Sequence, residues 1–165
     1  MKRTKISALP ALMAAACVVC AMPAGAEVTV KFIQPDNYAD MPFTPDGKER
    51  VMDDLKRHFI KLGSTLPAGQ DLRIEVTDVD LAGRMEPTSR AAPDFRILRG
   101  GADWPIISLR FAVESNGQVI KRGEERIADM SYLQQINHYT ASESLRYEKL
   151  MLDRWFKNVV VAKTP

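Results

Sequence analysis

The stretch from Asp71 to Pro87, DLRIEVTDVDLAGRMEP, carries the clearest strand signal in the sequence. Leu72, Ile74 and Val76 alternate with polar residues, and successive side chains of a strand point to opposite faces. A sheet with one aliphatic face buries it against a second layer, and an amphipathic helix can provide that layer. We therefore expect the chain to fold around a sheet with one covered face.

The alternation changes phase near Thr77. Continued with the same parity, it places Asp78 and Asp80 on the apolar face, and it exposes Val79 and Leu81 to water. Either the strand ends at this point or a β-bulge shifts its register by one residue. The two aspartates are either half of a cation or acid–base site, or turn residues that accept backbone N–H groups. The turn role is favoured, because two carboxylates alone are a weak signal for a site.

Residues 1–26 have the three parts of a secretory signal peptide. Basic residues at positions 2, 3 and 5 precede the uncharged apolar run Ile6–Cys20, and an Ala-x-Ala cleavage site ends at Ala26. The apolar run is too short to favour a transmembrane helix. We expect cleavage after Ala26 and a periplasmic or secreted protein in which residues 27–165 form a single domain without stable membrane insertion.

Cleavage would also remove the two cysteines, Cys17 and Cys20. The remaining chain then has no disulfide, thiol nucleophile or thiolate metal ligand, and a lipid anchor on either cysteine is not expected. Three of the positive charges lie before Ile6, so the rest of the chain is close to neutral. A near-neutral balance argues against nucleic acid or an anionic membrane surface as the main partner.

The remaining pattern predicts an α+β domain. Further strands are expected at Val28–Phe32, Phe95–Leu98, Ile106–Glu114 and Gln118–Ile127, and helices at Asp46–Gly63 and Thr140–Val159. Strand, helix and strand in sequence predict a parallel pair, and Asn116-Gly117 predicts a hairpin. The expected fold is a mixed sheet of four or five strands with the two amphipathic helices packed on one face. The other face is polar and is a candidate working surface.

Both helices begin at a capping-box pattern, Asp46–Glu49 in the first and Thr140–Glu143 in the second. The last helix is expected to bury one broad apolar face around Trp155 and to leave its charged residues in water. Those expected to be wet are Arg146, Glu148, Lys149, Asp153 and Arg154.

Ligand-binding candidates are few. Asp78, Asp80 and Arg84 are the candidate ligand-binding residues, and no catalytic residues, metal ligands or cofactors are expected. Four arginines, Arg84, Arg90, Arg96 and Arg99, precede Trp104. Guanidinium groups suit an anionic ligand, but interspersed acidic residues favour a solvated loop of mixed charge. His58 is expected at a helix edge, because no second ligand lies at metal-binding spacing.

Three segments together resemble the bacterial domain of unknown function 3016 family. They are Pro35-Asp36-Asn37-Tyr38-Ala39-Asp40, Val76-Thr77-Asp78-Val79-Asp80-Leu81-Ala82-Gly83, and Glu143-Ser144-Leu145-Arg146-Tyr147-Glu148-Lys149 running on to Trp155-Phe156. The resemblance spans essentially the whole chain after the signal peptide. It implies an exported bacterial protein, and it supplies neither an activity nor site residues.

Two classes of function are therefore considered. The first is a non-enzymatic envelope protein that binds another envelope protein or a small anionic ligand. The second is a carboxylate- or metal-dependent hydrolase built on Asp78 and Asp80, joined by Asp40 and assisted by His58 or His138. The first is favoured, because the sequence lacks a nucleophile–base–orienter set.

The signal peptide gives the first testable prediction. Expression of the whole chain in a bacterial host should yield a periplasmic or secreted species that begins at Glu27, as measured by intact mass. A species that still begins at Met1, or one that carries lipid on Cys17 or Cys20, would contradict this prediction.

Overall fold

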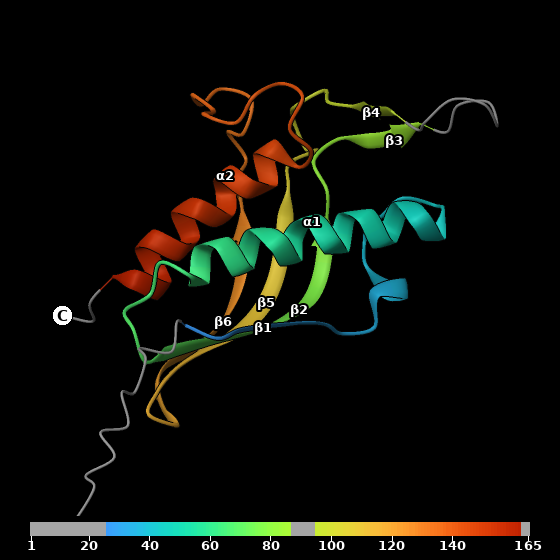
Figure 1. The fold of residues 1–165 in the computed structure, drawn as a ribbon. Helices are drawn as coiled ribbons and strands as arrows, with labels where there is room; N and C mark the ends of the chain where they lie inside the picture. The colour runs from blue at the N-terminus through green and yellow to red at the C-terminus, as the bar shows by residue number, and fades with distance from the viewer. Residues whose placement is uncertain (1–25, 87–94, 163–165) are drawn as a thin grey trace, which may run out of the picture.

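The computed structural model describes residues 26–86 and 95–162 (Figure 1). In order, its elements are β1 (Val28–Phe32), the short turn η1 (Pro35–Asn37), α1 (Pro45–Gly63), β2 (Gln70–Asp80), β3 (Arg84–Glu86), β4 (Phe95–Ile97), β5 (Ile106–Ser115), β6 (Gln118–Ala128), α2 (Arg146–Trp155) and the π-helical turn η2 (Phe156–Val161). The predicted α+β class, with a mixed sheet and two helices, is confirmed. Residues 1–25 of the expected signal peptide lie outside the described residues, and so does Arg90.

The main sheet has four strands in the order β1-β2-β5-β6. β1 and β2 are parallel, as the strand–helix–strand order predicted, and the other two pairs are antiparallel. The β5–β6 hairpin turns at Asn116 and Gly117, which both have positive φ, as an Asn-Gly turn requires. β3 and β4 form a separate two-stranded sheet.

The phase change near Thr77 is a β-bulge. The register of β2 against β5 shifts between Val76 and Asp78, and β2 continues to Asp80. The shift returns Val79 to the core side, where it is fully buried, and Leu81 is buried as well. Of the two alternatives left by the sequence, the bulge is therefore the one that occurs.

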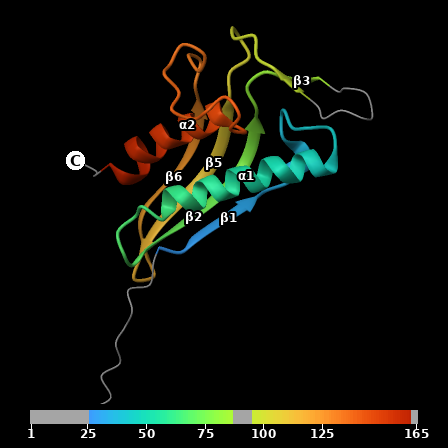
Figure 2. The same ribbon diagram turned by 45° about the horizontal axis from the view of Figure 1, so that its top comes forward.

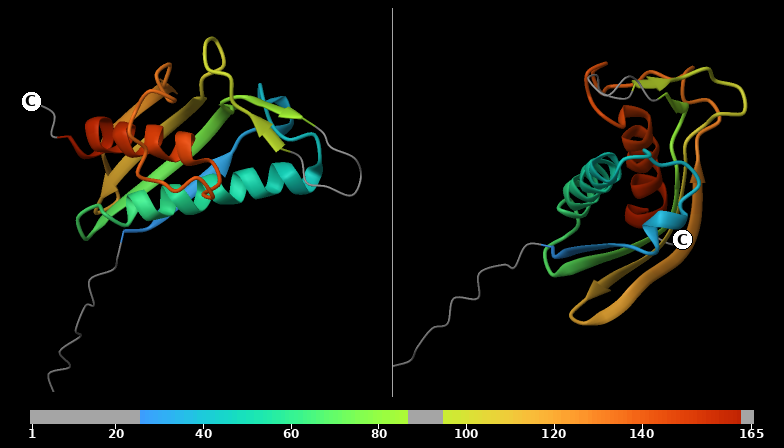
Figure 3. Two further views of the ribbon diagram at one scale, coloured as in Figure 1. Left: turned by 90° about the horizontal axis from the view of Figure 1, so that it is seen from above. Right: turned by 90° about the vertical axis from the view of Figure 1, so that its right-hand side faces the viewer.

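The core lies between the sheet and the two helices. In Figures 2 and 3, α1 and α2 lie on the same side of the sheet, and contacts join α1 to β1 and α2 to β6. The Trp155 ring stands edge-on to Phe59 of α1, with centroids 6.4 Å apart, and to Phe111 of β5, at 5.5 Å. This indole therefore joins both helices and the sheet in one cluster.

The first residue of each helix differs from the one that the capping-box pattern predicted. α1 starts at Pro45, because the Thr44 side chain accepts the backbone N–H of Gly47 at 3.1 Å and proline fits the first helical position. α2 starts only at Arg146, after Leu145 with positive φ. The Thr140–Glu143 segment forms a turn instead, in which the Glu143 N–H donates to the Thr140 carbonyl at 3.1 Å.

The prediction that the charged residues of α2 are exposed to water is also wrong for two of them. Glu148 has 0% of its surface exposed and Lys149 is buried, because the neighbouring loops as well as the sheet cover this helix. The side of α2 away from the sheet is therefore closed to water at Glu148 and Lys149, whereas Arg146, Asp153 and Arg154 remain partly exposed. Among residues 26–86 and 95–162, no helix is long and apolar enough to cross a membrane.

The position of Trp155 gives a prediction about stability. Trp155→Ala should lower the free energy of unfolding by about 3–5 kcal/mol, because it leaves a cavity where both helices and the sheet meet. Denaturant titration would measure the change. Phe43→Ala is the matched control, since Phe43 is 73% exposed and should change stability by less than about 0.5 kcal/mol. Equal effects of the two substitutions would refute this account of the core.

Candidate functional site

Asp78 holds the loop that follows β1 against the end of β2. Its Oδ1 accepts the backbone N–H of Ala39 at 2.9 Å, and Asp40 forms a parallel bridge with Asp80. The buried Tyr38 hydroxyl donates to the Val76 carbonyl at 2.9 Å, next to the bulge. Asp78 thus accepts a backbone N–H group, the role that the turn interpretation gave it, although its donor belongs to a different loop.

Several carboxylates crowd this end of the sheet. Burial and then the charge of Asp80 raise the pKa of Asp40. Burial, followed by the charges of Asp78 and Asp103, raises the pKa of Asp80. Within the described residues, no three acidic or histidine side chains converge as a metal ion requires. The structure therefore brings Asp40 and Asp80 close together, where their negative charges repel each other.

Arg84 lies on β3 and is directed elsewhere. Its guanidinium Nε lies 3.2 Å from Glu86, and its side chain is 77% exposed. The arginine whose charge acts on Asp40 is instead Arg96 of β4. The three candidate residues Asp78, Asp80 and Arg84 thus do not form one site through any contact among the described residues.

Arg96 belongs to a polar network that the sequence did not reveal. Its guanidinium forms a two-pronged ion pair with the buried carboxylate of Glu148, and its Nε donates to the Ala82 carbonyl. Glu148 also accepts the backbone N–H of Ala82 at 3.0 Å. The expectation of a solvated loop is therefore wrong at Arg96, because this side chain compensates a buried charge on α2.

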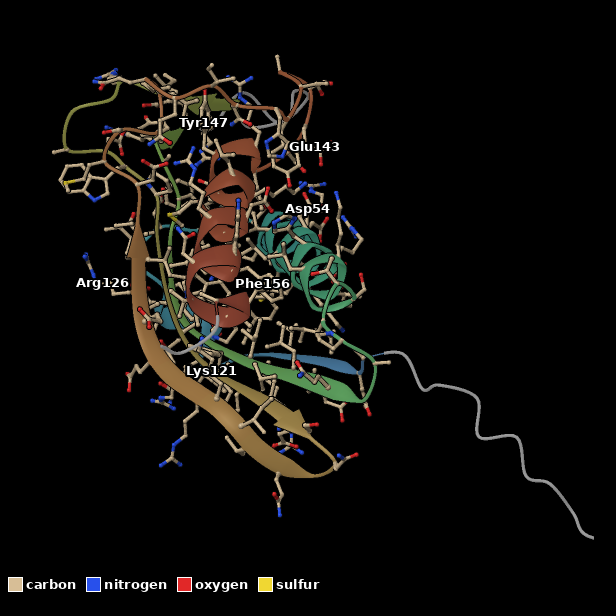
Figure 4. All side chains as sticks on the ribbon, turned by 90° about the vertical axis from the view of Figure 1, so that its left-hand side faces the viewer. Asp54, Lys121, Arg126, Glu143, Tyr147 and Phe156 are labelled. Atoms are coloured by element: carbon tan, nitrogen blue, oxygen red, sulfur yellow. The ribbon has the colours of Figure 1, made fainter. Side chains whose placement is uncertain are left out.

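A second titratable cluster connects α1, α2 and the loop before α2. His58 is only 4% exposed, not at a helix edge, and its Nε2 lies 3.0 Å from Asp153 Oδ1, although the ring N–H is not aligned with this oxygen. Tyr139 donates to Asp153 Oδ2 at 2.9 Å, and His138 Nε2 lies 3.3 Å from the same oxygen. A pocket of about 260 Å³ adjoins this cluster, and Figure 4 labels Asp54 and Glu143 among its lining residues.

The Asp153 carboxylate is held ionised in this cluster. Burial alone would raise its pKa, but the adjacent His58 imidazole, the hydrogen bond from Tyr139 and the charges of the two histidines lower it overall. Burial, together with the bond to Asp153, raises the pKa of Tyr139. His138 stacks on the Tyr139 ring at 4.3 Å, and His58 meets that ring edge-on at 6.1 Å. Both imidazoles thus pack around the phenol rather than around a common metal position.

Within the described residues, no helix covers the other face of the sheet (Figure 3), and charged side chains lie on it. One row of side chains alternates in charge across all four strands, through Lys31, Glu75, Arg110 and Glu124. Arg110 lies 3.5 Å from Glu75 and 3.8 Å from Glu124. A groove of about 510 Å³ crosses β2, β5 and β6 on this face.

Replacement by asparagine should change the stability of the folded protein in opposite directions at Asp80 and at Asp153. A raised pKa means that ionisation of Asp80 costs the folded state stability as pH rises through that pKa. The lowered pKa of Asp153 means that its ionised form contributes stability above the unfolded carboxyl pKa of about 3.9, which is lost as pH falls through the folded pKa. At neutral pH, Asp80→Asn should therefore raise the melting temperature. Asp153→Asn should lower the free energy of unfolding by about 1 kcal/mol.

The difference in stability between each variant and the wild type should become smaller at a pH of about 3, where carboxyl groups become protonated. Thermal melts across this pH range would measure them, and calcium should leave the wild-type melt unchanged. Destabilisation by Asp80→Asn, or a calcium-dependent rise that this variant abolishes, would show that Asp80 has a binding or structural role instead.

The comparison with known proteins agrees with the resemblance found in the sequence. The model of a family described as protein of unknown function (DUF3016) matches residues 26–158. No curated protein and no solved structure matches the chain. Because the matched range covers most of the sequence, the chain belongs to the DUF3016 family.

Proposed function

We propose that this chain is an exported, non-enzymatic bacterial binding protein whose ligand surface is the open face of the four-stranded sheet. Its ligand carries carboxylate groups, as on an acidic segment of another envelope protein. The observation that carries the proposal is a pair of arginines, Arg73 and Arg122, on either side of Ala112 in the groove on that face.

Long charged side chains line the groove, and the small residues Ala112 and Gly123 lie between them. Its lining comprises Arg73, Glu75, Arg110, Phe111, Ala112, Glu114, Arg122, Gly123 and Glu124. Ala112 lies between its cross-strand partners Arg73 and Arg122. Neighbouring strands lie about 4.8 Å apart, so a carboxylate above the alanine methyl group can reach both guanidinium groups.

The two arginines differ in whether they already form an ion pair within the described residues. Arg73 lies 3.1 Å from Glu114, and its side chain remains 64% exposed. Arg122 has no ion-pair partner in the part of the chain that the structure describes, and it is exposed. A guanidinium presents several donors in a fixed plane and binds carboxylates in pairs. Arg122 supplies the free charge, and Arg73 supplies additional donors.

The alternative, a hydrolase based on Asp78 and Asp80, has less support. Asp78 already accepts the Ala39 N–H, and the described residues contain no converging metal-ligand set. His58 and Asp153 form a histidine–carboxylate pair, but no serine or cysteine in the described residues hydrogen-bonds to His58. Without a side-chain nucleophile bound to His58 among the described residues, this pair is better explained by the packing of α1 on α2.

A labelled glutamate-rich peptide would test the proposal by fluorescence anisotropy. The wild type should bind it, and Arg73→Ala should weaken binding about tenfold or more, because a charged hydrogen-bonding partner is lost. Ala112→Glu should also block binding by placing a carboxylate between the arginines. Arg126→Ala is the control, since this exposed arginine lies on β6 outside the groove lining.

Absence of binding by the wild type would refute the proposal. Equal weakening by Arg73→Ala and Arg126→Ala would also refute it, because it would indicate nonspecific attraction to positive charge. A lysine-rich peptide of the same length should not bind.

A further inference from the structure

The outer edge of β6 is the longest unpaired strand edge of the main sheet. β6 spans 11 residues and ends the strand order, whereas the other edge strand, β1, spans 5. Among the described residues, no strand pairs with the outer side of β6, and Figure 4 shows this strand in front of the rest of the sheet. An exposed strand edge offers a row of N–H and C=O groups to another strand.

The middle of β6 is antisymmetric in charge. Lys121 and Arg122 precede Gly123, and Glu124 and Glu125 follow it. If two copies of this strand run antiparallel with their glycines opposite each other, every positive residue faces a negative one. Cross-strand pairs of opposite charge stabilise an antiparallel ladder, and like charges destabilise it.

We propose that β6 pairs with β6 of a second copy of this chain, antiparallel and centred on Gly123, to form a continuous eight-stranded sheet. Arg122 of each copy lies opposite Glu124 of the other, and Lys121 lies opposite Glu125. The interface is isologous, so each contact occurs twice about a two-fold axis. The pairing does not require a ligand on the open face, and the five N–H donors of the Arg122 guanidinium allow it to contact both Glu124 of the other copy and a ligand carboxylate.

The faces of the sheet agree with this pairing. Arg122 and Glu124 pair with Ala112 and Arg110 of β5 and share the open face, whereas Lys121 and Glu125 pair with Val113 and Leu109 on the helix side. Directly opposite residues of an antiparallel pair point to the same face. Each proposed ion pair thus joins residues that already point the same way.

Among two-fold axes that pass through one of the five residues 121–125, only the axis through Gly123 avoids placing like charges opposite each other. A two-fold axis through any residue places that residue opposite its own copy. At Lys121, Arg122, Glu124 or Glu125, two equal charges would therefore face each other. At Gly123, the position has no side chain, and a Cβ there would lie 2.8 Å from the Phe111 ring.

The charges that the pairing needs are largely available. Within residues 26–86 and 95–162, Arg122 and Glu125 have no ion-pair partner, and Glu124 lies 3.8 Å from Arg110. Lys121 donates to the Ala162 carbonyl at 2.8 Å, and it has no ion-pair partner among the described residues. On the helix side, Glu125 lines a pocket of about 320 Å³ between β6 and α2, which can receive Lys121 of the second copy.

Charge reversal with complementation tests the proposal. The whole chain would be expressed in a bacterial host, and its mass in solution measured by sedimentation equilibrium. The wild type should dimerise. The double variants Glu124→Lys/Glu125→Lys and Lys121→Glu/Arg122→Glu should each weaken dimerisation by about 30-fold or more, because four attractive pairs become repulsive. Equal amounts of the two variants should restore a mixed dimer.

Lys31→Glu on the opposite edge strand is the matched control and should dimerise like the wild type. Circular dichroism would establish that each variant is folded, and the single variants Arg122→Glu and Glu124→Arg replace any double variant that is not. A monomeric wild type at sub-millimolar concentration, variants that dimerise unchanged, or a mixture that stays monomeric would each overturn the proposal.

Discussion

The bulge in β2 is the constraint on which both the core and the polar end of the sheet depend. Before it, Leu72, Ile74 and Val76 fill the space under the helices, and after it Val79 resumes that direction. Without the extra residue, an aspartate would point into the core, where an ionised carboxylate costs several kcal/mol. The bulge thus lets one central strand contribute to an apolar core while Asp78 serves a polar loop.

Features determined by neighbouring residues were predicted from the sequence. The alternation in β2, the Asn116-Gly117 hairpin and the parallel β1–β2 pair all follow from local patterns. The capping boxes failed because stronger partners compete for the same residues. Thr44 and Pro45 start α1 earlier, and Glu143 pairs with Lys149 instead of closing a helical turn. Such competition is decided by three-dimensional contacts that a local pattern does not contain.

The polar residues with buried roles were harder to predict, although a signal existed. His58 lies seven residues after Val51, and Glu148 lies four before Leu152, so helical periodicity places both on apolar faces. Their charge suggested exposure, and their partners Asp153 and Arg96 are distant in sequence. Nothing in the local sequence separates Arg96 from Arg84. A partner across the fold is what makes a buried ionisable side chain acceptable.

Because the pKa of Asp80 is raised and that of Asp153 is lowered, pH should change the attachment of two loops in opposite directions. Acid relieves the repulsion between Asp40 and Asp80, which fastens the loop after β1 more firmly to the end of β2. The same acid discharges Asp153 and loosens the attachment of the loop around Tyr139 to α1 and α2. Local opening of the backbone, which amide exchange reports, therefore moves from one loop to the other as pH falls.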